Sequence, residues 1–253
     1  MSVLELDLIR EKARELREAL NLRTLSVGVK LFNYDTDVKA VRAKGHRYCQ
    51  ALMRARYGEH VLLGKEEIGC IPAAAVFGFS PLSEAFSSGE QPVKVGVAKE
   101  RETASRMYQE VVSFAPGEIK QIYLFPLEEA PLQPDVVVIE DEAEKIMWLL
   151  LAYVNVMKGE RVEFNTQVMR ATCLDCTAIP YKLRKAGLSL GCYGCRTATD
   201  IMSNEIIIGF PIEYFLEIAD FIKYFSERAI PAVKEKAPYK KLKELIEGEK
   251  IHE

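Results

Sequence analysis

Several features that mark common enzyme classes are missing from this sequence. It has three histidines among 253 residues, which leaves little material for a Ser-His-Asp triad. No Gly-x-Gly-x-x-Gly fingerprint, other Gly-rich phosphate loop or Gly-x-Ser-x-Gly nucleophile elbow is present, so nothing indicates dinucleotide binding or serine hydrolysis. The Cys-x-x-x-Cys-x-x-Cys arrangement of radical-generating clusters is also absent.

Long hydrophobic runs and an excess of one charge are missing as well. The longest apolar stretch, 146–157, is interrupted by Asn155 and is shorter than the roughly 20 residues that span a bilayer. The net charge of −3 gives no general attraction to nucleic acid or to an anionic membrane. No basic segment followed by an apolar run marks a signal peptide. We therefore expect a cytoplasmic protein with neither nucleic acid nor membrane as a partner.

Cysteine carries the most specific signal. Four of the six cysteines form two Cys-x-x-Cys pairs separated by fifteen residues, namely Cys173, Cys176, Cys192 and Cys195. In a reducing compartment such pairs indicate metal or thiol chemistry more than disulfides. Four soft thiolates suit a tetrahedral zinc ion or a [4Fe–4S] cluster.

The choice between these metal centres depends on the surroundings of the pairs. The pairs lie in a large chain with apolar neighbours and two extra cysteines, Cys49 and Cys70, which favours iron–sulfur chemistry over zinc. A structural zinc site that scaffolds a complex is the alternative. A metal-free thiol–disulfide enzyme is a third hypothesis.

Cys49 and Cys70 have no partner motif. They are candidates for catalytic, substrate-facing thiols, for a redox pair or for additional metal ligands. The plain alternative is that both are small buried hydrophobic residues.

Basic residues lie between and just after the two pairs. Lys182, Arg184 and Arg196 could offset the negative charge of a thiolate centre, or bind a small anionic ligand or a redox partner protein. A solvated basic surface segment is the alternative.

Hydrophobic periodicity predicts an α/β or α+β fold in which a mixed sheet is flanked by helices. We expect one domain over residues 1–253, with C-terminal helices. The predicted strands are 26–32, 61–63, 93–98, 119–125, 135–139 and 160–164. The predicted helices include 3–20, 46–57, 142–157, 212–228 and 239–248. Aromatic residues at helical spacing in 212–228 predict either a core face or a homo-oligomer contact.

Two halves, about 22–130 and 131–230, follow a similar order of elements. Each runs from a strand through a helix to a second strand and a cysteine, and the segment 206–211 resembles 75–81. We interpret this order as an internal duplication. It would place Cys70 and Cys173 in related positions at one shared site.

Three motifs resemble a known family. They are Tyr48-Cys49-Gln50-Ala51 with the helix-ending Gly58, the segment from Cys70 to Phe79, and Gly191-Cys192-Tyr193-Gly194-Cys195-Arg196. Together they are similar to the family named domain of unknown function 169, in its cysteine-rich, archaeal-type form. The resemblance implies that all six cysteines belong to one functional region. It does not imply any particular reaction.

These observations predict an iron–sulfur protein of anaerobic metabolism. The two Cys-x-x-Cys pairs would hold a [4Fe–4S] cluster for electron transfer or for a redox reaction on a small molecule. Whether the chain is an enzyme is left open.

Overall fold

The computed structural model describes residues 3–109 and 112–249. The described residues form one sheet of seven strands in the order β2-β3-β4-β1-β5-β7-β6. The strands are β1 (Val27–Phe32), β2 (Val41–Arg42), β3 (Val61–Gly64), β4 (Gln121–Pro126), β5 (Val136–Glu142), β6 (Gly187–Ser189) and β7 (Glu205–Pro211). β2 and β3 run parallel and the other neighbours are antiparallel. The predicted mixed sheet is confirmed, and the fold is of the α+β class.

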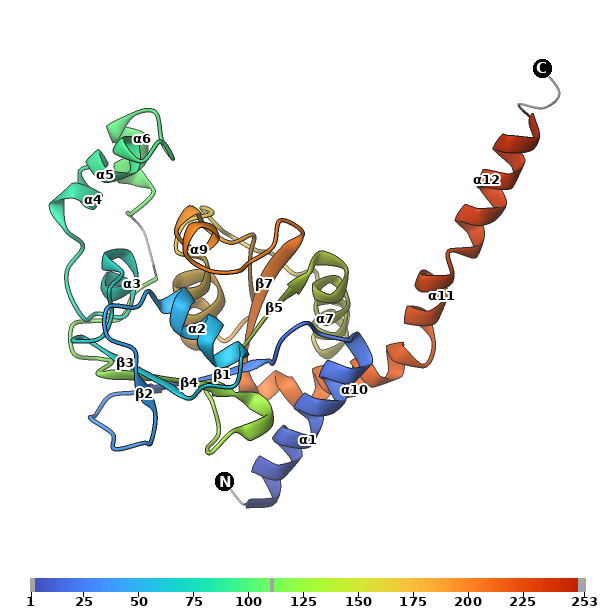
Figure 1. Cartoon of the computed structure of the whole chain (residues 1–253), viewed down its shortest axis with the longest axis horizontal. Coiled ribbons are helices and arrows are strands. Elements are labelled where there is room, and N and C mark those ends of the chain that lie inside the picture. Colours follow the sequence, from blue (N-terminus) through green and yellow to red (C-terminus); the bar gives the residue numbers. More distant parts are fainter. Residues whose placement is uncertain (1–2, 110–111, 250–253) are drawn as a thin grey trace.

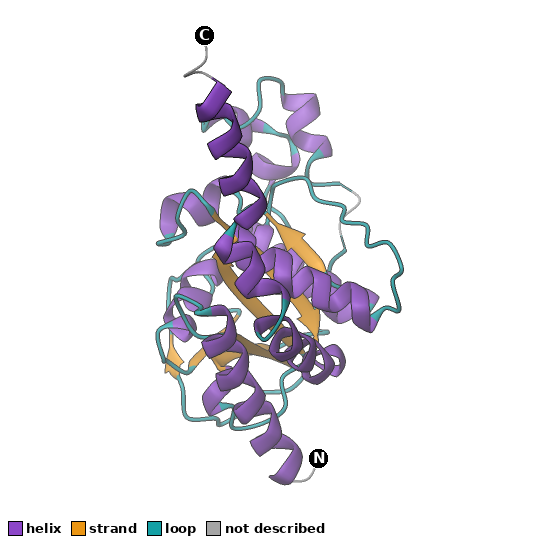
Figure 2. Ribbon diagram, turned by 90° about the vertical axis from the view of Figure 1, so that its right-hand side faces the viewer, coloured by secondary structure: helices purple, strands orange, loops and turns teal. Residues whose placement is uncertain are grey.

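Helices cover both faces of this sheet (Figures 1 and 2). One face packs against α1 (Val3–Leu20), α7 (Ala143–Val156) and α10 (Phe215–Ser226). The other packs against α2 (Tyr48–Arg56), α3 (Ile71–Val76) and the π-helical η2 (Ala171–Ala178). The strands supply both cores by alternation, so that Val136 and Val138 face the α2 side and Val137 faces the α1 side.

The aromatic helix predicted at 212–228 is α10, and it belongs to the core. Phe215 and Phe225 are buried, and the helix lies against α1 and α7. Tyr224 is exposed. The core-face alternative is therefore confirmed for this helix.

Two helical segments project from the sheet and its layers. α4 (Glu84–Ser87), α5 (Glu90–Lys94) and α6 (Arg101–Arg106) stand together above α3, and we call residues 80–109 the arm (Figure 1). α11 (Ala229–Glu235) and α12 (Ala237–Glu249) extend away from the body. The remaining short helices are η1 (Leu127–Glu129), α8 (Ile179–Leu183), α9 (Tyr193–Ala198) and η3 (Ile212–Tyr214). Among residues 3–109 and 112–249, no helix has both the length and the apolar character needed to cross a bilayer.

Two strand predictions are wrong. Residues 93–98 form the end of α5 and a following turn, and residues 160–164 have no regular secondary structure. Both segments alternate in hydrophobicity, but neither pairs with a strand of the sheet, and strand propensity depends on such pairing. Likewise, 75–79 is helical or turn whereas 206–210 lies in β7, so their similarity in sequence does not extend to secondary structure. The proposed internal duplication stays a prediction.

Candidate functional site

Five of the six cysteines line one cavity of about 480 Å³. The cavity lies between the arm and the elements on the α2 side of the sheet, and its cysteines are Cys49, Cys70, Cys173, Cys192 and Cys195. The structure thus brings both unpaired cysteines to the same place as three members of the Cys-x-x-Cys pairs.

Cys49 and Cys70 are each positioned by the beginning of a helix. Cys49 is the second residue of α2 and is buried. Cys70 immediately precedes α3, and Pro72 suits the first turn of that helix because its nitrogen needs no hydrogen-bond acceptor there. The two helices lie on the same side of the sheet, so both thiols reach one cavity.

The π-helical η2 separates the first pair. Cys173 lines the cavity, whereas the buried Cys176 thiol donates to the carbonyls of Gly187 at 3.8 Å and Ile207 at 3.6 Å. Glycine lets η2 approach β7 this closely, because a Cβ at Gly209 would lie 1.9 Å from the Cys176 carbonyl oxygen. The close packing therefore holds Cys176 against the sheet and outside the cavity lining.

The second pair stays together. Cys192 precedes α9, and its sulfur accepts a hydrogen bond from the Cys195 N–H at 3.4 Å. The two sulfurs are 3.3 Å apart. Arg196 fixes this loop by donating to the carbonyls of Leu190 at 3.0 Å and Met202 at 3.0 Å.

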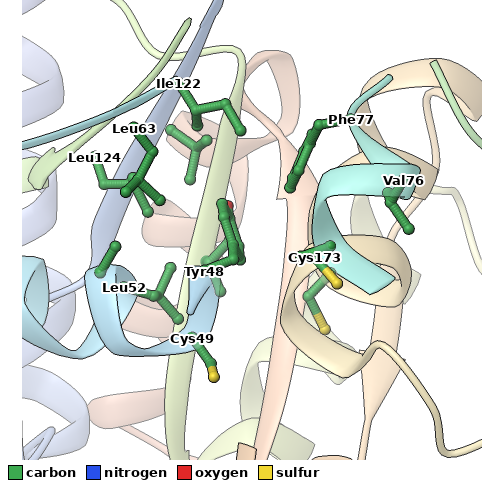
Figure 3. Packing of buried hydrophobic residues seen from close by; sticks show 14 of the residues in the cluster. Tyr48, Cys49, Leu52, Leu63, Val76, Phe77, Ile122, Leu124 and Cys173 are labelled. Atoms are coloured by element: carbon green, nitrogen blue, oxygen red, sulfur yellow. The ribbon is translucent and has the colours of Figure 1, made fainter. Parts of the chain in front are cut away.

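Hydrogen bonds join the cysteine-bearing elements to one another. The buried Tyr48 hydroxyl on α2 bonds to Thr177 of η2 at 2.8 Å. Arg47, just before α2, donates to the Gly194 carbonyl of α9 at 3.1 Å. Figure 3 shows Cys49 and Cys173 at one end of the core cluster that surrounds Tyr48. The relative positions of the thiols are thus set by a buried, hydrogen-bonded framework.

Burial and neighbouring thiols raise the pKa values of Cys70, Cys173, Cys192 and Cys195, which favours their protonated forms in the absence of a cation. Burial raises the pKa of Cys173 well above its usual value, and the charges of Cys70 and Cys192 raise it further. The pKa of Cys195 is raised to about 12. Its hydrogen bond with Cys192 lowers this pKa, but the neighbouring Cys49 thiol and burial together raise it by more. A bound metal would reverse this balance, since coordination deprotonates a thiol outright.

The basic residues predicted to assist the site lie outside the cavity lining. Lys182 pairs with Glu118 at 3.1 Å and Arg184 pairs with Glu213. Arg196 is engaged by loop carbonyls, and it acts on the site by holding the loop of the second pair.

Two other arginines, which were not predicted from the sequence, supply positive charge to the cavity lining instead. Arg47 and Arg170 both line the cavity. Their closeness in sequence to Cys49 and Cys173 was the available signal.

The cavity thiols include one close pair, Cys192 and Cys195, whose sulfurs lie 3.3 Å apart. Among the described residues no group of three or more His, Cys, Asp or Glu side chains is arranged to hold a metal ion. Four thiolates on one zinc at about 2.3 Å would require sulfurs about 3.8 Å apart. A cluster instead spreads its ligands over several irons. Thiolates are suitable ligands for both zinc and an iron–sulfur cluster, and Cys176 lies outside the cavity lining.

This fold and cysteine-walled cavity define an α+β protein with a buried thiol site. Residues 15–220 match the model of the DUF169 family, described as "Uncharacterised ArCR", and the chain belongs to this family. It is similar to "Uncharacterized protein MJ0308" of Methanocaldococcus jannaschii, with 26% identity over 224 residues that cover 87% of this chain and 95% of the relative. No solved structure matches the chain significantly.

Proposed function

We propose that this chain is a cytoplasmic iron–sulfur protein that holds a cluster in its five-thiol cavity. The observation that carries the proposal is the convergence of five thiols from four separate elements on one largely apolar cavity. Unrelated buried cysteines would have no reason to gather on one wall, whereas a thiolate-ligated cluster requires this.

The proposed ligand set changes one member of the two sequence pairs. Cys173, Cys192 and Cys195 would each supply a thiolate, and Cys49 or Cys70 would supply the fourth. Cys176 is engaged by backbone carbonyls. The cysteine that is not a ligand would face the remaining space as a free thiol.

A bound cluster would supply one-electron redox chemistry, or a Lewis-acidic iron where a thiolate is missing. The protein's own part is to exclude water with an apolar wall, to fix the thiols through Tyr48 and Arg47, and to leave room for a small molecule. Because the thiols line a cavity large enough for a ligand, this placement favours a reaction on a small molecule over simple electron transfer to a partner protein.

Anaerobic purification with iron, zinc and acid-labile sulfide analysis tests the proposal. We expect iron and sulfide in the wild-type chain, their loss in Cys173→Ala, and their retention in Cys176→Ala. The last two variants are matched, because both remove a buried thiol from the same π-helical segment.

Other results would change the assignment. About one zinc per chain without sulfide would support the structural zinc site instead. Equal loss of iron in both variants would restore the two original pairs as the ligand set. A wild-type chain that holds neither metal, even after incubation with iron and sulfide, would refute the proposal.

A further inference from the structure

Arg170 is a buried guanidinium in the wall of the cavity. It is 6% exposed, and its Nη2 donates to the Met107 carbonyl at 2.9 Å. Its Nε has no hydrogen-bond partner among the described residues. Burying such a donor without a partner is energetically unfavourable. The guanidinium therefore retains hydrogen-bonding capacity that the described residues do not use.

The backbone of Arg170 is also unusual. Its φ of 56° places it in the left-handed region, directly before η2. Non-glycine residues adopt this conformation infrequently, and they do so preferentially where a site requires it. The guanidinium is held over the ring of Tyr108 at 4.8 Å, and Tyr108 also lines the cavity. The position of this charge is therefore fixed by the fold.

The charge of Asp175 acts on Arg170 from outside the cavity lining. Arg170 and Arg47 both line the cavity, and neither forms a salt bridge with a described carboxylate. The described lining contains no Asp or Glu. The Ser83 hydroxyl, from the arm, is a second buried polar group that lacks a partner among the described residues and lines the same cavity. The cavity wall thus carries positive charge, and two of its residues have donors that the described residues do not use.

The rest of the lining is mainly apolar. The apolar lining includes Ile71 and Pro72 of α3, and Phe86, Pro92 and Val95 of the arm. A volume of about 480 Å³ falls in the range of small-molecule sites and is far larger than one inorganic anion. The ligand that matches this wall has one charged end and an apolar body.

We infer that the cavity binds a small organic monocarboxylate, with its carboxylate on Arg170 and its apolar chain against the arm. Guanidinium and carboxylate match as planar, bidentate partners. The inference names the ligand class of the proposed cluster site and rests on that proposal for any reaction, but the binding itself requires only the chain.

Calorimetry and ligand-observed NMR on the full-length protein test this inference. The probes are straight-chain monocarboxylates from acetate to octanoate, 1-hexanol as the uncharged match of hexanoate, and inorganic phosphate. We expect affinity to rise with chain length, and hexanoate to bind at least about tenfold more tightly than hexanol or phosphate. This ratio corresponds to one good charge-assisted contact.

Variants locate the binding site. Arg170→Gln should weaken hexanoate binding at least about tenfold, whereas the matched control Arg184→Gln, a surface arginine paired with Glu213, should leave it unchanged. If Arg170→Gln does not fold, Phe86→Ser in the arm provides the second variant and should weaken octanoate more than acetate.

The inference is overturned if no monocarboxylate binds, if hexanol or phosphate binds as tightly as hexanoate, or if folded Arg170→Gln binds like the wild type. Iron and sulfide are measured on the same samples. Carboxylate binding by a chain that takes up no iron, even after incubation with iron and sulfide, would leave this inference standing and refute the cluster. Iron uptake without carboxylate binding would do the reverse.

Discussion

Glu140 on β5 is a buried carboxyl whose charge should make the stability of this protein depend on pH. It is 5% exposed and lies 2.9 Å from Arg56, which is 1% exposed. Burial raises the pKa of Glu140 to about 7, because the Arg56 charge only partly offsets the loss of water and the repulsion from Glu205. The folded chain therefore keeps this proton to a higher pH than the unfolded chain.

The sign and the size of the effect follow from this difference. Between the ordinary glutamate value of 4.5 and about 7, the folded state binds more protons, so stability falls as pH rises. At about 1.4 kcal/mol per pKa unit, the difference of about 2.5 corresponds to about 3 kcal/mol. Glu140→Gln resembles the protonated form and should lack this dependence.

Urea denaturation at a series of pH values measures the effect. We expect the unfolding free energy of the wild type minus that of Glu140→Gln to fall by about 3 kcal/mol from about pH 4.5 to pH 8. Glu142→Gln is the matched control on the same strand, since its side chain is 50% exposed, and it should differ from the wild type by at most about 0.5 kcal/mol. A difference for Glu140→Gln that grows with pH would refute the reasoning, because it would mean that the ion pair with Arg56 outweighs burial.

Three further variants probe the framework of the site. Gly209→Ala places a Cβ 1.9 Å from the Cys176 carbonyl oxygen and should cost about 1–3 kcal/mol in urea unfolding; a loss below about 0.5 kcal/mol would contradict the close packing. Arg196→Met removes the donors that hold the loop of the second pair. Alkylation of Cys192, monitored by mass spectrometry, should therefore become faster. An unchanged rate would count against this role of Arg196. Tyr48→Phe removes a buried hydrogen bond and should lower thermal stability by about 1 kcal/mol, an effect that calorimetry can measure and that a stability equal to the wild type would exclude.

Much of the fold could be predicted because local pattern and final structure agree. Helix α1 begins and ends where its hydrophobic periodicity places it, and β5 occupies the apolar run predicted at 135–139. The segments 93–98 and 160–164 have the alternation of strands but no strand beside them. Strand formation needs a partner that is distant in sequence, and that partner is not visible in the pattern.

The candidate site, too, could be predicted from the sequence only in part. Spacing alone grouped Cys173 with Cys176, because a tight turn brings such pairs together. In the structure the π-helical turn and its packing on Gly209 send the two thiols to different places. The convergence of Cys49 and Cys70 with Cys173 arises from contacts between α2, α3 and η2 across one face of the sheet.

The periodic helices and strands, the family and the unusual set of cysteines could all be recognised from the residues alone. These properties are local, or they can be read from residue types. Only the folded arrangement shows which thiols share a cavity, and that Arg47 and Arg170 line it whereas Lys182 and Arg184 do not. Side-chain direction and burial depend on packing between elements far apart in the chain, and they are fixed only when those elements meet.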